Sequence, residues 1–195
     1  SVGKRAGLSS PSQSEVSQLL VDYAKTKARI VRLKSGDGGL FGRLEEEIIA
    51  LSKENITYEI IPGISSALAA AASIGIPLTR RMHSRRVQFI TGHDVKGNLP
   101  NDLNLSALTD PTATTAVFMG TRTFVELAKK LLLFGLPKNT PVIYAESVST
   151  PKENIIRATI EELIYILQKK THLSKLPAII IYGALMDLSD IEKKY

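Results

Sequence analysis

Residues 29–43 read Arg-Ile-Val-Arg-Leu-Lys-Ser-Gly-Asp-Gly-Gly-Leu-Phe-Gly-Arg, and this stretch decides the fold class. The aliphatic and β-branched side chains of residues 29–33 predict a strand. The glycines that follow predict a loop, and the next segment has helical spacing, with Leu44, Ile48 and Leu51 inward and Glu45 to Glu47 mostly outward. A strand that leads through a glycine-rich loop into a helix is typical of α/β folds.

The rest of the chain repeats this alternation, which favours an α/β architecture with largely parallel strands. Further strands are predicted at residues 58–61, 87–90, 115–119, 142–145, 155–158 and 178–182. Helices are predicted after Ser12, at 64–74, at about 123–134 and after Thr159; Ser12 with Glu15 and Thr159 with Glu162 have the spacing of capping boxes. The stretch 92–110 is rich in Asn, Asp, Gly and Pro and is predicted to be a loop or linker. We expect two α/β lobes, residues 1–92 and 93–195.

Composition narrows the class of protein. The 195 residues are 44% hydrophobic and 23% charged, as in ordinary globular proteins, and no run of eighteen apolar residues predicts a membrane span. The absence of cysteine excludes disulfides, thiolate metal sites and a cysteine nucleophile, and fits a cytoplasmic location. The net charge of +6 is compatible with nucleic acid, an acidic membrane surface or an acidic small substrate.

Two strand-to-helix loops are candidate ligand sites. The glycine-rich loop that begins at Ser35 follows a predicted strand, where open α/β sheets bind ligands, and Asp37 offers an acceptor for hydroxyls or an ammonium. It is neither a GxGxxG fingerprint nor a P-loop, and a tight structural turn explains it equally well. The second loop, Pro-Gly-Ile-Ser-Ser at 62–66, lies at the same predicted edge, although by itself a helix cap is the better interpretation.

Four arginines lie within seven positions, at Arg80, Arg81, Arg85 and Arg86. Guanidinium groups bind carboxylates and phosphates with forked donors, so a polycarboxylate substrate is a plausible partner, and a solvated loop is the alternative. No aromatic residues are interleaved for base stacking, so nucleic acid is not expected.

Metal and hydrolase chemistry have little support. The three histidines, His83, His93 and His172, have no metal-ligand spacing. No Ser/His/Asp order and no paired-carboxylate motif stands out. We therefore expect no metal site.

Together these motifs resemble the uroporphyrinogen III C-methyltransferases of the tetrapyrrole methylase family. The resemblance runs from Val2 to about Leu188 and rests on residues 2–7, 31–37, 41–43, 58–79, 91–93, 117–120 and 141–146. The Ser-Gly-Asp-Gly-Gly loop looks most like the methylase half of siroheme synthases. The family implies a two-lobed fold with mostly parallel sheets and an active site in the cleft between the lobes.

The resemblance also implies site residues. For the cofactor S-adenosylmethionine they are Ser35, Gly36, Asp37, Leu40, Ser65, Ser66, Met119 and Val148. Lys4 matches the lysine assigned as proton donor, and the four arginines are expected to meet substrate carboxylates. Ser147-Val148-Ser149 departs from the glycine-containing family segment, and valine is a poor choice if this position needs a positive φ.

The implied activity is methylation of uroporphyrinogen III to precorrin-2, in siroheme or cobalamin biosynthesis, with S-adenosylhomocysteine as product. A homodimer is implied, with neither nucleic acid nor membrane as partner. The family's first strand and its proton-accepting aspartate would precede the given residues, so we expect this chain alone to be nearly inactive. Alternatives are a methyltransferase for a later precorrin, a non-catalytic fragment that binds adenosyl ligand or tetrapyrrole, and a nucleic-acid methylase or binder.

Overall fold

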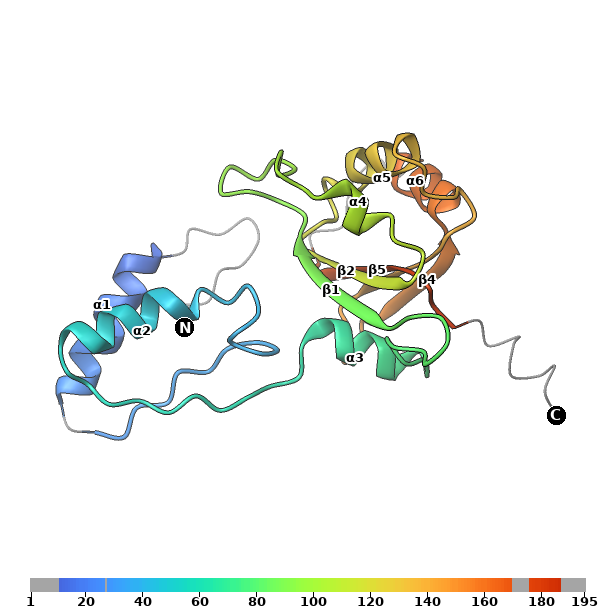
Figure 1. Cartoon of the computed structure of the whole chain (residues 1–195). Coiled ribbons are helices and arrows are strands. Elements are labelled where there is room, and N and C mark those ends of the chain that lie inside the picture. Colours follow the sequence, from blue (N-terminus) through green and yellow to red (C-terminus); the bar gives the residue numbers. More distant parts are fainter. Residues whose placement is uncertain (1–10, 27, 170–175, 187–195) are drawn as a thin grey trace. The chain divides into compact units, whose positions relative to one another are not determined.

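The computed structural model describes residues 11–26, 28–169 and 176–186. The chain divides into two compact units, Ser1–Ser65 and Ser66–Tyr195, and each is described by itself (Figure 1). The lobe boundary predicted after residue 92 stays a prediction.

The described part of the first unit is built on two packed helices, α1 (Gln13–Lys25) and α2 (Leu44–Lys53). The predicted capping box of α1 is confirmed. The Glu15 amide donates to Ser12 Oγ over 3.2 Å, and the Ser12 amide donates to Glu15 Oε2 over 2.6 Å. These two bonds satisfy amides that the first helical turn leaves without partners, so the start of α1 is fixed locally by its sequence.

Two segments predicted as strands, residues 29–33 and 58–61, belong to no strand. The prediction is wrong for the described residues, because a strand requires backbone hydrogen bonds to a partner. Within the described ranges no backbone hydrogen bond joins either segment to a neighbouring strand. Their apolar side chains are nonetheless of the types that strands favour. Three of these residues are largely exposed: Val31 (70%), Leu33 (81%) and Ile61 (72%).

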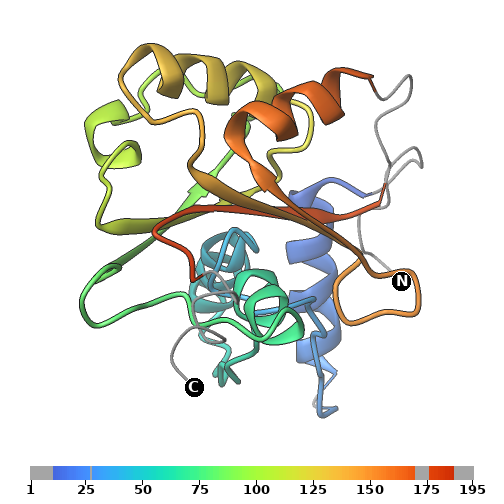
Figure 2. The ribbon, with the colours of Figure 1, turned by 90° about the vertical axis from the view of Figure 1, so that its right-hand side faces the viewer.

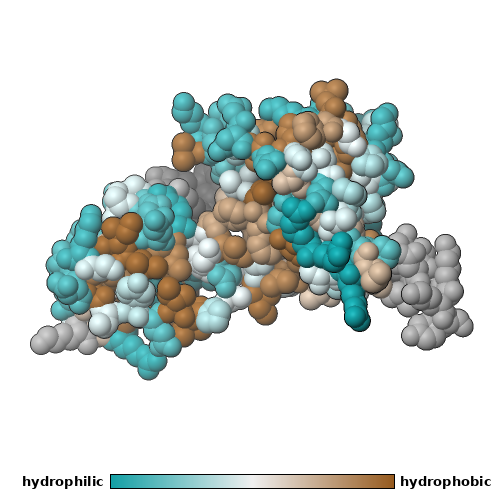
Figure 3. Space-filling model, in the orientation of Figure 1, coloured by the Kyte–Doolittle hydropathy of each residue, from teal (hydrophilic) through white to brown (hydrophobic). Residues whose placement is uncertain are grey.

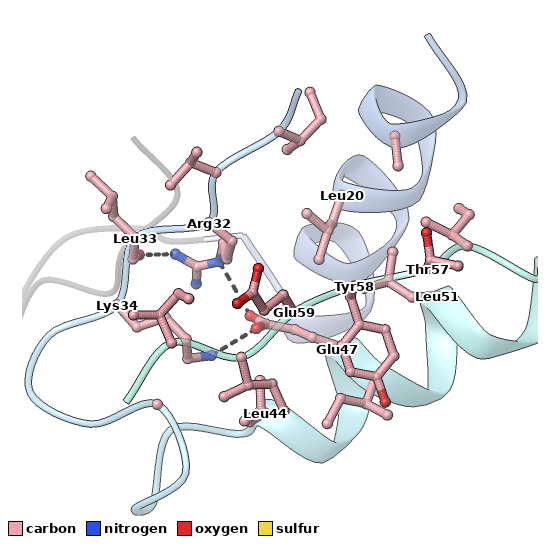
Figure 4. A pocket seen from close by; sticks show the side chains of 18 of the residues that line it. Leu20, Arg32, Leu33, Lys34, Leu44, Glu47, Leu51, Thr57, Tyr58 and Glu59 are labelled. Atoms are coloured by element: carbon pink, nitrogen blue, oxygen red, sulfur yellow. Dashed lines mark hydrogen bonds and ion pairs between the residues drawn. The ribbon is translucent and has the colours of Figure 1, made fainter. Parts of the chain in front are cut away.

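The same two segments line a cavity of about 680 Å³ within the first unit. Leu20 of α1 and Leu51 of α2 line it too, so its surroundings are largely apolar (Figure 4). Apolar surface is also visible on this unit in the space-filling view (Figure 3). The first unit therefore has a cavity whose walls include two stretches of main chain without a sheet partner.

The second unit holds a five-stranded sheet in the order β1-β2-β5-β3-β4. The strands are β1 (Arg86–Thr91), β2 (Ala113–Phe118), β3 (Pro141–Glu146), β4 (Asn154–Thr159) and β5 (Ala178–Gly183). Its helices are α3 (Ser66–Ser73), α4 (Leu105–Leu108), α5 (Phe124–Leu133) and α6 (Ile160–Lys169). All five strands and the three longer helices were predicted. The short α4, within the predicted loop 92–110, was not.

The expected mostly parallel pairing is wrong for this sheet. Only β1 and β2 pair in parallel, whereas β2–β5, β5–β3 and β3–β4 are antiparallel. The alternating pattern does give β1, β2 and β3 the same direction. The last described strand, β5, lies between β2 and β3 and runs antiparallel to both, which the local sequence of β5 does not reveal.

Helices cover both faces of the sheet (Figures 1 and 2). On one face Leu127 of α5 and Leu163 of α6 pack with Tyr144 and Tyr182. On the other face the small residues of α3, such as Ala67 and Ala70, pack closely on the strands. The two apolar layers bury β2, β3 and β5 almost completely. No helix of the described residues combines the length and apolarity needed to cross a bilayer.

Candidate functional site

The two predicted ligand loops meet through one carboxylate. Asp37 Oδ1 accepts a hydrogen bond from the Gly39 amide at 2.7 Å, and Asp37 Oδ2 accepts from the Gly63 amide at 3.0 Å. The first bond closes the glycine-rich loop on itself, and the second ties it to the Pro62-Gly63 turn, 26 residues further along the chain. Two loops predicted separately are therefore one assembly within the first unit.

Close backbone contact accompanies this bond. A Cβ placed on Gly63 would lie 2.0 Å from the Gly36 carbonyl oxygen, well inside van der Waals contact. Gly36 itself has φ of 67°, in the left-handed region that glycine adopts without strain. Within the loop, a Cβ on Gly42 would lie 2.5 Å from the Gly38 carbonyl. The glycines at 36, 42 and 63 are thus required by packing and conformation of the loops.

The exit of the first loop into α2 is held by an ion pair. Arg43, in the left-handed region with φ of 56°, is the N-cap residue that directly precedes α2. Its guanidinium donates from Nε and Nη2 to the two Glu46 carboxylate oxygens, both over 2.6 Å. Such bidentate geometry fixes direction as well as distance, so it orients the loop's departure into the helix.

The Asp37 carboxylate stays suited to a ligand despite its two internal bonds. Two hydrogen bonds lower the pKa of Asp37 below its usual value; the bond from the Gly63 amide has the larger effect and the bond from the Gly39 amide the smaller. The carboxyl group therefore stays ionised. An ionised carboxylate has about four acceptor sites, so lone pairs remain for a ligand hydroxyl or ammonium. Ser35, Gly36 and Gly39 are exposed around it. This donor and acceptor set fits the polar parts of an adenosyl amino-acid cofactor.

In the second unit, two loops cross at the carboxyl ends of β1 and β2. A Cβ on Gly92 would lie 2.4 Å from the Gly120 Cα, so these glycines permit the contact. His93 Nδ1 lies 3.1 Å from the Met119 carbonyl oxygen. Met119 directly follows β2 with φ of 55°, and the residue is 44% exposed. The predicted cofactor residue Met119 is therefore presented at a strand end, and His93 contacts its backbone.

The arginine cluster separates into two pairs. Arg80 Nη1 donates to the Leu185 carbonyl over 2.9 Å, and Arg86 forms an ion pair with Asp110. Arg81 and Arg85 are exposed, and neither guanidinium forms an ion pair with a described residue. Arg81 and Arg85 are thus the better candidates for a ligand carboxylate, whereas Arg80 and Arg86 have structural partners.

Comparison with known proteins decides the family. The pattern of the Tetrapyrrole (Corrin/Porphyrin) Methylases matches residues 2–164. The chain belongs to the tetrapyrrole methylases.

Two curated relatives cover nearly the whole chain. It is 38% identical over 190 residues to the "S-adenosyl-L-methionine-dependent uroporphyrinogen III methyltransferase, chloroplastic" of Arabidopsis thaliana, which covers 97% of the chain and 51% of the relative. It is 40% identical over 187 residues to the siroheme synthase of Actinobacillus pleuropneumoniae serotype 7, which covers 96% and 37%. The chain therefore spans about half or less of the length of these relatives.

Solved structures agree on the fold. A uroporphyrin-III C-methyl transferase from Thermus thermophilus, complexed with S-adenyl homocysteine, has a TM-score of 0.73 at 34% identity, covering 88% of this chain and 73% of that one. A cobalt precorrin-4 methyltransferase has a TM-score of 0.75 at 25% identity, covering 91% and 72%. The mixed α/β fold is therefore that of tetrapyrrole methylases.

The remaining family-implied residues have distinct positions. Ser65 is buried and Ser66 begins α3. Leu40 is half-buried, and its amide donates to the Asp37 carbonyl over 3.2 Å. Lys4 lies outside the described residues.

The segment around Val148 adopts positive φ angles without a glycine. The positive φ values fall on Ser147 (51°) and Ser149 (62°), which flank Val148, and the valine side chain packs against the core. The departure from the family segment is therefore compatible with the observed backbone. No cluster of three or more possible metal ligands occurs among the described His, Asp and Glu residues.

Sequence reasoning missed Glu47. It was placed among the outward acids of α2, yet it is only 2% exposed and binds Arg32 and Lys34. One feature of the sequence could have indicated this burial. Arg32 and Lys34 are two residues apart, so in an extended segment both side chains lie on the same side and can face one acid.

We predict that Gly63→Ala disrupts the loop assembly. The new Cβ would meet rigid backbone at Gly36, so the free energy of unfolding of the first unit should fall by about 1–3 kcal/mol. Gly38→Ala is the control, because its Cβ would meet the flexible Lys34 stem at 3.1 Å. Amide hydrogen exchange of α1 and α2 measures the change. Equal protection in the two variants would contradict the tight contact.

Proposed function

We propose that this chain is the methyl-transferring part of an S-adenosylmethionine-dependent uroporphyrinogen III C-methyltransferase, which forms precorrin-2 for siroheme or cobalamin synthesis. The observation that carries the proposal is the Asp37 bridge, which joins two glycine-dependent loops into one polar, exposed assembly. Support comes from the two curated relatives, at 38 and 40% identity. The first experiment is transfer of a labelled methyl group from S-adenosylmethionine to uroporphyrinogen III by the complete enzyme.

For the methyl transfer, the main task of the protein is to align the two reactants. When bound, the cofactor supplies an activated sulfonium methyl group. The residues of the chain must orient a nucleophilic pyrrole carbon toward it, which removes much of the entropic barrier. We assign cofactor binding to Ser35, Gly36, Asp37 and Leu40, with Ser65, Ser66, Met119 and Val148 from the other loops. Lys4 is assigned to proton transfer.

A later precorrin is the less favoured substrate. The cobalt precorrin-4 methyltransferase is 25% identical to the chain, below the 34% of the uroporphyrin-III enzyme from Thermus thermophilus. A panel of uroporphyrinogen III and later precorrins would separate the two substrates. A homodimer and a cytoplasmic location remain predictions, and the Arabidopsis relative is chloroplastic.

We also propose that a further strand completes the first unit. The cavity between residues 29–34 and 56–63 has largely apolar walls, and its main chain has no sheet partner among the described residues. An extended segment would bring backbone donors and acceptors to both walls and cover exposed Val31 and Leu33. The first strand implied by the family is the occupant we assign to this cavity.

Replacing Asp37 tests the cofactor site. Asp37→Ala removes a charged acceptor worth about 1.5–3 kcal/mol, so the Kd for S-adenosylhomocysteine should rise about ten- to a hundred-fold. Asp37→Asn keeps one acceptor oxygen and should lose less. Calorimetric titration measures both variants, with the exposed Asp102→Ala as control. Unchanged affinity in folded Asp37→Ala would remove this residue from the site.

Replacing the arginines should have different effects on the KM for the tetrapyrrole in a kinetic assay of the complete enzyme. Arg81→Gln or Arg85→Gln should raise the KM for the tetrapyrrole about tenfold, because each loses a charge-assisted bond to a carboxylate. Cofactor affinity should not change. Lys129→Gln, on the exposed side of α5, controls for loss of positive charge. Wild-type kinetics in the single glutamine variants of all four arginines would mean that the cluster has no role in substrate binding.

A longer form tests the strand. A polypeptide that carries the residues encoded upstream of Ser1 should methylate uroporphyrinogen III, and the 195-residue chain should be nearly inactive even with saturating cofactor. The two rates are compared at equal protein concentration. Comparable rates would show that the cavity needs no further strand.

A further inference from the structure

Glu47 is a buried acid that the proposed chemistry does not use. It belongs to α2, and its side chain is 3% exposed. Transfer of an ionised carboxylate out of water is costly unless partners compensate its charge. A glutamate in this position therefore requires an arrangement that holds it.

Three side chains bind the Glu47 carboxylate, and Figure 4 shows two of them, Arg32 and Lys34. Arg32 Nε lies 3.2 Å from Oε1, and Lys34 Nζ lies 2.8 Å from Oε2. Gln13 of α1 donates from Nε2 to Oε1 over 3.3 Å. Both carboxylate oxygens are bound, and α1, α2 and the segment at 32–34 are joined at a single residue.

The segment that Glu47 holds has few other polar anchors. Residues 29–34 take part in no sheet, and the exposed Val31 and Leu33 alternate with the two cations that point to Glu47. Arg32 also donates from Nη1 to the Leu33 carbonyl over 2.6 Å, which leaves the guanidinium bound at two points. The ion pairs to Glu47 thus hold this segment against α2.

The same ion pairs reach the glycine-rich loop. Lys34 directly precedes Ser35, and its Cδ would lie 3.1 Å from a Cβ placed on Gly38. The aliphatic stem of Lys34 therefore passes beside Gly38 on its way to Glu47. Where Lys34 lies determines where the loop begins, and the stem also limits the space available to the loop.

We propose that Glu47 is the positioning residue of the cofactor loop. Through Arg32 and Lys34 it holds the loop in the shape in which Asp37 binds the Gly39 and Gly63 amides, and so it sets cofactor affinity without touching the cofactor. The affinity part of this inference rests on the proposed function. The loop-holding part concerns the free protein.

The test compares Glu47→Gln with Glu45→Gln in the full chain. Glu45 is an exposed acid on the same helix, so its variant removes equal charge from the surface. In Glu47→Gln, hydrogen exchange of the Gly39, Leu40 and Gly63 amides should accelerate about tenfold or more, since a bond to a charged group is lost. Amides of α1 and α2 should change much less. Equal acceleration throughout the first unit would overturn the positioning role, as would an unchanged loop.

The affinity readout uses S-adenosylhomocysteine as the probe. Its Kd should rise about tenfold in Glu47→Gln and stay at the wild-type value in Glu45→Gln. Wild-type affinity in Glu47→Gln would overturn the proposal. If the wild-type chain itself binds none, the proposed function fails, and the exchange comparison alone decides whether Glu47 holds the loop.

A second variant tests the proposal if Glu47→Gln does not fold. Lys34→Met keeps an unbranched stem beside Gly38 and leaves the Arg32–Glu47 pair in place. It should accelerate exchange at the same three amides. Unchanged exchange in Lys34→Met would show that the ion pair does not position the loop.

Discussion

The two hydrogen bonds that Asp37 accepts are the interaction on which the candidate site depends. Each oxygen takes one backbone amide, Gly39 on its own loop and Gly63 on the other, so one side chain sets both loop shape and loop spacing. The glycines follow from that constraint, because a side chain on Gly63 would push the loops apart. The same bonds lower the pKa of the carboxyl group and keep it anionic. The loop assembly and the proposed cofactor contact thus depend on one ionised group.

Around the Asp37 bridge, polar side-chain contacts hold chain segments that in a sheet would be held by backbone hydrogen bonds. In the second unit, β2, β3 and β5 are positioned by ladders and two apolar layers. In the first unit the segments that lead into both loops have no described ladder. Glu47 anchors the first of these segments through two cations, and Asp37 ties the second to the loop. The loops are therefore held by a few charge-assisted bonds, each of which matters more than a single ladder bond.

What the sequence predicted well was local. The Ser12 and Thr159 capping boxes and the five strands of the second unit follow from spacing and side-chain type within each segment. Pairing is not local: residues 29–33 look like a strand yet have no partner, and the antiparallel entry of β5 depends on distant neighbours. The glycines and Asp37 marked the site loops. The burial of Glu47 could not be read from helical spacing, since it depends on cations about fifteen residues away.

The position of β5 has a consequence for synthesis. The central strand of the sheet is the last of the described strands, so β2 and β3 have no common neighbour until residues 178–183 have been made. Until then, two largely apolar strands have open edges, which invite pairing with other chains. Contacts between segments far apart in sequence also form slowly. A nascent chain would thus depend on protection from aggregation until β5 closes the sheet.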